Sequence, residues 1–519
     1  MRYLFTLILC LLLTFMKGQE LESIRFDSTL SNYTNRLSSD TLHKFLSVIS
    51  ADSLEGRETG EHGQKIAANY IADQMRDLGI TGVGDSLDYF QRFGLWSIPY
   101  DQSYMVVDGD TLNALEDYYT FSPILKKAIS GDRMIFLGYG IEDSLYNNYQ
   151  DIDASGKIGV IMSGEPSVGK TYTLTNSEEQ SKWSSEFDLK RDAAIRNGCK
   201  GLIVVSENFE QLLPRVSYYL KRKKLKLEKP DTTYFPVSYV GSDFIDAYFG
   251  EKNAKKMEKK LQKWDWQSGI EVDKSVDWYF EGDYSYVHSE NVMGKIEGSS
   301  KPKEAVVITA HYDHLGKTDK VIYNGADDDG SGTSALLEVM RVFKEAENEG
   351  NGPKRTVLFL FVSGEEKGLL GSSYYTDNPL FPLNATVANL NIDMIGRTDV
   401  NHEADSSKYI YLIGSDKIST ELHLISEKMN ELYTGFEIDY KYNDEDDPTR
   451  LYYRSDHYNF AKNGIPVIFY FRGLHEDYHK PEDTIEKIEF DTIREVSKLV
   501  FTTAWQVLNK EDRLNTDVN

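Results

Sequence analysis

Cysteine is almost missing from this sequence, which has only Cys10 and Cys199 among its 519 residues. Cys10 lies in an N-terminal apolar stretch that we expect to be removed, so the mature chain keeps Cys199 alone. A single cysteine excludes an internal disulfide framework. Export without disulfides is compatible with a periplasm or with the outside of a cell.

Long apolar runs are also scarce. One runs from Leu4 to Met16, after one basic residue and before small and polar residues. This run is too short and wrongly flanked for a membrane span, and its shape is typical of a secretory signal peptide. We predict a signal peptide at residues 1–18, cleaved after Gly18, and therefore a periplasmic or extracellular location. No later segment of the sequence approaches the roughly 20 apolar residues that a spanning helix needs.

Positive charge is in deficit. The chain has 58 Lys and Arg against 83 Asp and Glu, which gives a formal net charge of −25 and argues against a phosphate-tracking, nucleic-acid-binding surface. Hydrophobic residues make up 40% of the chain and aromatic residues 12%, which supports folded domains. A chain of this length predicts two or three of them.

After the predicted signal peptide, the pattern of apolar and polar residues changes twice along the chain. Residues 19–97 include a helical pattern over 62–78 that Gly79 can end, whereas residues 98–284 contain short β-rich pieces and read as a compact separate domain. Residues 285–512 alternate apolar runs of strand length with helical patterns. Such alternation predicts an α/β fold with a mostly parallel sheet sandwiched by helices. The runs are residues 304–313, 355–366, 386–396, 408–415 and 465–473, and the helical patterns are 333–347, 419–435 and 491–509.

Carboxylates and imidazoles gather where the apolar runs end. In such sheets ligands bind outside the carboxyl ends of the strands. Carboxylates packed closely would repel one another, and a divalent cation removes that cost. The residues concerned are His311, Asp313, His314, Asp327, Asp328, Asp329, Glu365, Glu366, Asp393, His475, Tyr478 and His479.

Imidazole and carboxylate ligands, with no thiolate among them, suit Zn²⁺ and would also suit Mn²⁺ or Co²⁺. The acidic groups are too many for one zinc with three protein ligands, whereas two ions about 3.5–4 Å apart can share one carboxylate. The adjacent Glu365 and Glu366 fit this arrangement, because side-chain alternation breaks as the backbone turns at a strand end. We therefore expect one glutamate to bind a metal and its neighbour to carry a proton in the same pocket.

Five motifs in this order resemble peptidase family M28, the co-catalytic zinc aminopeptidases. They are "AHYDHLG", "GADDDGSG", "SGEEKGLLGS", "NIDMIG" and "DYHKPEDT", and the resemblance covers most of residues 285–510. Residues 38–95, with "SLEGRETG", resemble the N-terminal part of the same catalytic domain. The residues between them, with "YGIEDSLYNNYQDIDASGKIGVIMSGEP", resemble the protease-associated (PA) domain that is often inserted there.

The resemblance implies a role for each motif residue. Asp328 would bridge two zinc ions, with Asp327 and Asp329 as the alternatives, and a cis peptide bond would follow the bridging aspartate. His314 falls on the other strand face from His311 and is expected at the rim, although it is the nearest rival for a ligand position. The implied set is His311 and Asp393 on one zinc, Glu366 and His479 on the other, Glu365 as general base, Asp313 beneath His311 and Tyr478 at the oxyanion.

The implied reaction is hydrolysis of an amide at the free N-terminus of a peptide substrate. Pocket-wall candidates are Arg454, Asp456, His457 and Arg472. A carboxypeptidase is the first alternative, since Arg454 or Arg472 could take a substrate carboxylate. A single-zinc glutaminyl cyclase and an inactive receptor-like protein are disfavoured, because the sequence keeps all five ligands and the base.

Overall fold

The computed structural model describes nine segments of the chain, and the predicted signal peptide at residues 1–18 lies outside them. They are residues 24–98, 103–121, 129–131, 133–221, 224–229, 235–261, 269–280, 285–402 and 408–518. Among these residues, no helix is both long enough and apolar enough to cross a membrane.

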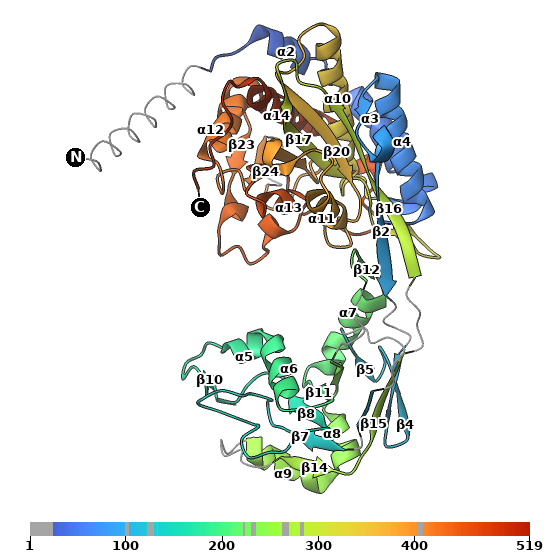
Figure 1. Ribbon diagram of the computed structural model, residues 1–519, viewed down its shortest axis with the longest axis vertical. Coiled ribbons are helices and arrows are strands. Elements are labelled where there is room, and N and C mark those ends of the chain that lie inside the picture. The colour runs from blue at the N-terminus through green and yellow to red at the C-terminus, as the bar shows by residue number, and fades with distance from the viewer. Residues whose placement is uncertain are drawn as a thin grey trace, which may run out of the picture. The chain divides into compact units, whose positions relative to one another are not determined.

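The chain divides into two compact units (Figure 1). One unit comprises Met1–Gly94 and Val287–Asn519, and the other comprises Leu95–Tyr286. The second unit therefore begins at Leu95 and ends at Tyr286. The sequence placed this inserted domain at residues 98–284.

A mixed sheet forms the centre of the first unit. Its strands run in the order β2-β16-β20-β17-β21-β24-β22-β23, with β1 paired to β16. The pairs β20–β17, β17–β21 and β21–β24 are parallel, whereas β16 and β22 join this centre in antiparallel pairs. The strands are β1 (Thr81–Gly82), β2 (Phe90–Ile98), β16 (Ser285–Ile296), β17 (Lys301–His311), β20 (Arg355–Val362), β21 (Thr386–Ile392), β22 (Tyr409–Ile413), β23 (Glu437–Asp439) and β24 (Val467–Phe471).

Helices cover both faces of this sheet. They are α2 (Ser28–Thr34), α3 (Ser39–Ile49), α4 (His62–Leu78), α10 (Gly330–Asn348), α11 (Leu370–Asp377), α12 (Thr420–Met429), α13 (His457–Ala461) and α14 (Phe490–Asn509). Successive residues of β17 point to opposite faces of the sheet. Val306 and Ile308 pack in one core, with residues of α3, α4, α10, α12 and α14. Val307 packs in the other core, with Tyr375 of α11 and Phe460 of α13. The predicted α/β fold, with a sheet sandwiched by helices, is therefore confirmed.

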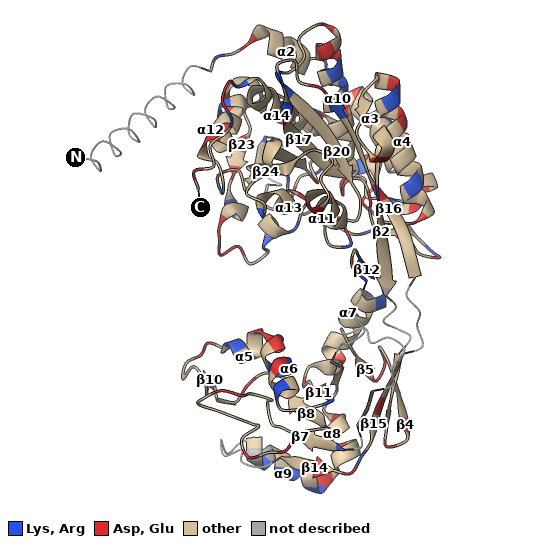
Figure 2. Cartoon of the chain, viewed as in Figure 1, with Lys and Arg blue, Asp and Glu red and all other residues tan. Residues whose placement is uncertain are grey.

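The helix that the sequence placed at residues 62–78 is α4. Its apolar face, which includes Ile71 and Met75, is buried against the residues that follow position 287. Gly79 ends it in a left-handed conformation with φ of 72°, and the N–H of Gly79 donates to the carbonyl of Arg76. Figure 2 shows acidic and basic residues interspersed on α3, α4 and α10, so the outward sides of these helices carry both signs of charge.

The second unit contains two larger sheets of short strands. One runs β14-β7-β8-β11-β13-β5 and the other β4-β3-β15-β6. The strands are β3 (Ser103–Val107), β4 (Asp110–Asn113), β5 (Tyr118–Tyr119), β6 (Ile129–Gly131), β7 (Met134–Phe136), β8 (Ile158–Met162), β9 (Ser167–Val168), β10 (Thr171–Tyr172), β11 (Gly201–Val205), β12 (Lys224–Lys226), β13 (Val237–Val240), β14 (Ile270–Val272) and β15 (Val276–Phe280). The helices are α5 (Lys182–Ser185), α6 (Phe187–Arg196), α7 (Phe209–Lys221), α8 (Asp243–Phe249) and α9 (Glu251–Leu261).

Candidate metal centre

The parallel strands at the centre of the sheet bring the predicted site residues to one edge. His311 is the last residue of β17, Glu365 and Glu366 follow β20, Asp393 follows β21, and the loop after β24 carries His479. Because neighbouring strands among these are parallel, their carboxyl ends lie together. Asp328 comes from the loop before α10, which follows the two-stranded hairpin of β18 (Gly316–Lys317) and β19 (Ile322–Tyr323).

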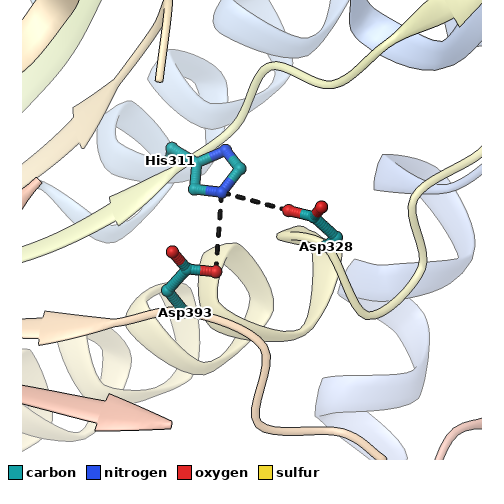
Figure 3. A group of neighbouring side chains, drawn as sticks. All are labelled: His311, Asp328 and Asp393. Carbon is teal, nitrogen blue, oxygen red and sulfur yellow. Dashed lines mark ion pairs between the residues drawn. The ribbon is translucent and has the colours of Figure 1, made fainter. Parts of the chain in front are cut away.

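Three buried side chains form the first potential metal-binding group, His311, Asp328 and Asp393 (Figure 3). The Nε2 atom of His311 lies 3.3 Å from Oδ1 of Asp328 and 3.6 Å from Oδ1 of Asp393. The Oε2 atom of Glu365 lies 4.0 Å from the same Nε2. The first group therefore has the residues that the sequence assigned to one zinc, with the predicted base beside them.

The second group consists of His314, Asp328 and Glu366, so it shares Asp328 with the first. His479 Nε2 lies 3.1 Å from Oδ2 of Asp328 and 3.2 Å from Oε2 of Glu366. Within the group itself, Nδ1 of His314 lies 2.8 Å from Oε1 of Glu366. The expectation that His314 sits at the rim is wrong: its side chain is fully buried.

The neighbours of Asp328 are engaged elsewhere. Asp329 caps α10, since its Oδ1 accepts from the N–H of Gly332 at 2.9 Å and its Oδ2 accepts from the N–H of His311 at 3.2 Å. Asp327 accepts from the N–H of Gly396 at 2.6 Å and lies 3.3 Å from Nε2 of His475. Asp328 is thus the one of the three that faces both groups, and the bond between Asp328 and Asp329 is cis, as the resemblance implied.

Burial and charge separate the protonation of the adjacent glutamates. Burial, together with the charges of Glu366 and Asp393, raises the pKa of Glu365 well above its usual value. Burial acts in the same direction on Glu366, but His479 and His314 outweigh it and lower its pKa to about 2. Two carboxyl groups whose pKa values are driven apart in this way can divide the roles of proton carrier and permanent anion.

Asp313 lies behind the first group, at the position that the resemblance implied. It lies beneath His311, with its carbonyl oxygen 3.1 Å and its Oδ1 3.8 Å from Nδ1 of the imidazole. The hydroxyl of Thr59 donates to Oδ2 of Asp313 at 2.6 Å, and the N–H of Glu365 donates to Oδ1 at 3.2 Å. Such support fixes the orientation of a ligating imidazole.

Besides Thr59, three supporting residues escaped the sequence reasoning. Ser455 donates to Oδ2 of Asp393 at 2.6 Å, and Asp483 accepts from the N–H groups of Asp327 and Asp328 at 3.0–3.1 Å. Arg57 is fully buried and donates to the carbonyls of residues 49, 312, 324 and 325. Arg57 lies in "SLEGRETG" and Asp483 in "DYHKPEDT", and this was the only feature of the sequence that could have indicated a supporting role for them. Ser455 lies in none of the motifs, so nothing in the sequence pointed to it.

A pocket adjoins the first group. Beside His311, Asp328, Glu365 and Asp393 it is lined by Met394, Leu451, Arg454, Phe469, Phe471, Leu474 and Tyr478. Tyr478 stacks on His479, with ring centroids 3.8 Å apart, and its hydroxyl accepts from Arg454 at 3.4 Å. The predicted residues Glu365, Tyr478 and Arg454 therefore share one pocket with the metal-binding group.

The other pocket-wall candidates belong to the interior. Asp456 and His457 are fully buried, and the ring of His457 stacks on Phe469 at 4.9 Å. Arg472 is also fully buried, and its guanidinium donates to the carbonyl of Tyr409 at 2.8 Å. These three residues are not among the described residues that line the pocket, so their assignment to its wall is wrong.

The donor set fits zinc. Two groups of buried imidazole nitrogens and carboxylate oxygens meet at Asp328, which is the combination that suits Zn²⁺. Oε1 of Glu366 is buried without a hydrogen-bond partner among the described residues. A buried polar atom of this kind is costly unless a ligand or an ion satisfies it.

Comparison with known proteins shows similarity to peptidases. Residues 291–504 match the family described as peptidase family M28. Aminopeptidase YwaD of Bacillus subtilis is 30% identical over 240 residues, which cover 44% of this chain and 47% of the relative. A probable leucine aminopeptidase of Arthroderma otae is 26% identical over 310 residues, which cover 54% of this chain and 80% of that relative.

A solved structure, the aminopeptidase from Aneurinibacillus sp. strain AM-1, shares the fold. The match covers 94% of this chain and 98% of that one, with a TM-score of 0.56 and 17% identity. By sequence, this chain spans about half the length of YwaD and of a probable zinc metalloprotease of Pyrenophora tritici-repentis, of which it covers 47% and 51%.

Proposed function

Because residues 291–504 match peptidase family M28, we propose that this protein is an exported aminopeptidase that holds two zinc ions. It would remove N-terminal residues from peptides. The observation that carries the proposal is the position of Asp328, which lies in both metal-binding groups while Glu365 lies beside the first. The signal-peptide pattern at residues 1–18 supports export.

The proposed ligands follow from the distances. His311 and Asp393 would hold one ion, Glu366 and His479 the other, and Asp328 both. Zinc bound there would polarise the scissile carbonyl and lower the pKa of a bound water.

The protein's own residues then handle the proton and the substrate. Glu365, whose pKa is raised by burial, accepts the proton of the attacking water and passes it to the departing amine. Asp313 keeps His311 oriented throughout. Tyr478 lines the same pocket, and its hydroxyl would donate to the developing oxyanion.

The pocket next to the first group would receive the N-terminal side chain of the substrate. Its apolar lining includes Met394, Leu451, Phe469, Phe471 and Leu474. Because these side chains cannot satisfy a buried charge, the pocket favours an apolar residue at this position.

The first test combines a zinc count with two substrates. The purified mature chain is expected to contain two zinc ions, to cleave an amino-terminal leucine anilide, and to leave the N-acetylated form of the same anilide intact. One bound ion would overturn the shared-carboxylate centre. Equal cleavage of the blocked anilide would overturn the requirement for a free amine.

A carboxypeptidase remains the second candidate because Arg454 lines the pocket. Arg454 is an exposed residue, and its guanidinium could bind a substrate carboxylate. A tripeptide with a blocked N-terminus distinguishes the two activities. An aminopeptidase leaves it intact, whereas a carboxypeptidase releases its last residue and loses this activity in Arg454→Ala.

The second unit is proposed to be a protease-associated domain. Its position between Gly94 and Val287 and its short-stranded sheets support this assignment. We propose that it shapes access to the site or holds longer peptides. The net charge of −25 supports peptides rather than nucleic acid as substrates.

A further inference from the structure

His314 is a buried histidine whose ring has no hydrogen bond. Its side chain has no exposed surface, and both Nδ1 and Nε2 lack a hydrogen-bond partner among the described residues. Burying the polar atoms of an imidazole without partners is unfavourable, so such a group in a native interior calls for an explanation.

The ring of His314 belongs to the second metal-binding group. Its Nδ1 is 2.8 Å from Oε1 of Glu366 and 3.8 Å from Oδ2 of Asp328. The first of these pairs is close enough for a hydrogen bond, yet Nδ1 and Oε1 are both without one. Elsewhere in the chain, Nδ1 of His402 at 2.7 Å from Oδ1 of Asp399 does form a hydrogen bond.

Two atoms that are close but do not point at each other can both point at a third position. The proposed ligand pairs show the same relation, because Nε2 of His479 lies 3.1 Å from Asp328 and 3.2 Å from Glu366. Donors about 2.0–2.1 Å from a tetrahedral zinc stand about 3.3–3.4 Å apart. The separations of His314, at 2.8 and 3.8 Å, lie on either side of that value.

The loop around His314 is built to admit its ring. Gly325 has a φ of +56°, and a Cβ atom there would stand 2.5 Å from Cγ and Cδ2 of the imidazole. It would also stand 2.2 Å from the carbonyl oxygen of Asp328. Only glycine therefore leaves room for the ring so close to the loop that carries Asp328.

We propose that His314 is a direct ligand of the second ion, in addition to His479, Glu366 and Asp328. This inference rests on the two-ion centre of the proposed function. The second ion then has four protein side chains, whereas the first is offered only His311, Asp328 and Asp393 by the described residues. The second ion should accordingly bind more tightly, and the first should keep open positions for water and substrate.

The test measures zinc binding to the full chain without reference to activity. Metal-free protein is titrated with Zn²⁺ against a chromophoric chelator, for the parent and for His314→Ala, His314→Asn and His457→Ala. We expect the parent to bind two ions. In both His314 variants, the dissociation constant of the ion at the second group should rise more than about 100-fold, beyond the 10–100-fold typical of an outer-shell partner. His457→Ala is the matched control, because it removes an equally buried imidazole that stacks on Phe469.

His314→Asn separates a ligand from a hydrogen-bond donor. Its amide nitrogen can replace Nδ1 as a donor to Glu366 but is a poor zinc ligand. Recovery of parent affinity in His314→Asn, or two tightly bound ions in His314→Ala, would overturn the inference and leave the two-ion centre intact. Fewer than two ions in the parent would overturn the proposed function itself.

A measurement on the unaltered chain covers the case in which the variants fail to fold. In the Co²⁺-loaded protein, each ligating imidazole gives one exchangeable N–H proton resonance with a large hyperfine shift. Three such resonances are expected, from His311, His314 and His479. Two would exclude His314 as a ligand.

Discussion

Replacing Glu365 and Glu366 one at a time by glutamine should affect different properties, although the two residues are adjacent: the first change should lower kcat and the second should lower the zinc content. Each substitution keeps the size of the side chain and removes its charge. Glu365 lies 4.0 Å from His311 and lines the pocket, whereas Glu366 lies 3.2 Å from His479 and has 4% of its side chain exposed. In the proposed function, the first position would therefore face the substrate and the second would face a metal ion.

For Glu365→Gln the expected change is kinetic. Loss of a positioned general base lowers kcat by about 100- to 10,000-fold. That loss is about 2.7–5.5 kcal/mol of transition-state stabilisation. Because the base acts when ionised and burial raises its pKa, kcat of the parent should fall as the pH is lowered through that raised pKa. The variant should lose this acid limb of the profile and keep two zinc ions.

For Glu366→Gln the expected change is in metal content. Its carboxylate keeps a pKa of about 2 and would face the proposed second ion, so a neutral amide in its place should release that ion before any kinetic effect is measured. Zinc counts and kcat at saturating leucine anilide decide the matter. Two retained ions in Glu366→Gln, or a lost ion in Glu365→Gln, would refute the division of roles between them.

Two further predictions concern stability. Asp483→Ala leaves two buried backbone N–H groups without an acceptor, which at about 1–3 kcal/mol each should lower the unfolding free energy of the metal-free chain by about 2–6 kcal/mol. Urea unfolding checks this, and Glu482→Ala, next to it and exposed, should stay within about 0.5 kcal/mol of the parent; equal losses in both would contradict the reasoning. Burial lowers the pKa of His457 to about 3. Below about pH 6.5 the unfolded chain therefore binds a proton at this histidine and the folded chain does not, so the unfolding free energy should decrease as the pH is lowered. Between pH 7 and pH 5 the parent should lose about 2 kcal/mol more than His457→Phe, and parallel losses in thermal unfolding would show that this histidine is protonated in the fold.

The sequence was most informative where the order of elements alone decides the geometry. Apolar runs alternating with helices implied parallel strands, and parallel strands bring His311, Glu365 and Asp393 to one edge without further information. The choice of Asp328 over its two neighbours came from the motif. The structure gives the physical reason, since Asp327 and Asp329 accept N–H groups from Gly396 and Gly332.

The sequence was least informative where loops fold over one another. His314 and Arg472 are polar and follow strands, which favours exposure, yet the structure buries both. The burial of His314 depends on a loop that returns to the strand end at Gly325, and Arg472 depends on the carbonyl of Tyr409, 63 residues away. Side-chain periodicity within one segment has no access to such partners.

The buried guanidinium of Arg57 has a consequence for synthesis of the chain. Its acceptor on Tyr312 lies 255 residues later, beyond the whole of the second unit. At roughly 5–20 residues per second, a ribosome needs about 13–50 s to synthesise the residues between Arg57 and Tyr312. Until then α3 and α4 cannot cover their apolar sides with the residues that follow position 287. The nascent chain must therefore carry an exposed hydrophobic surface for tens of seconds, and a premature stop within residues 95–286 leaves that surface without its partner permanently.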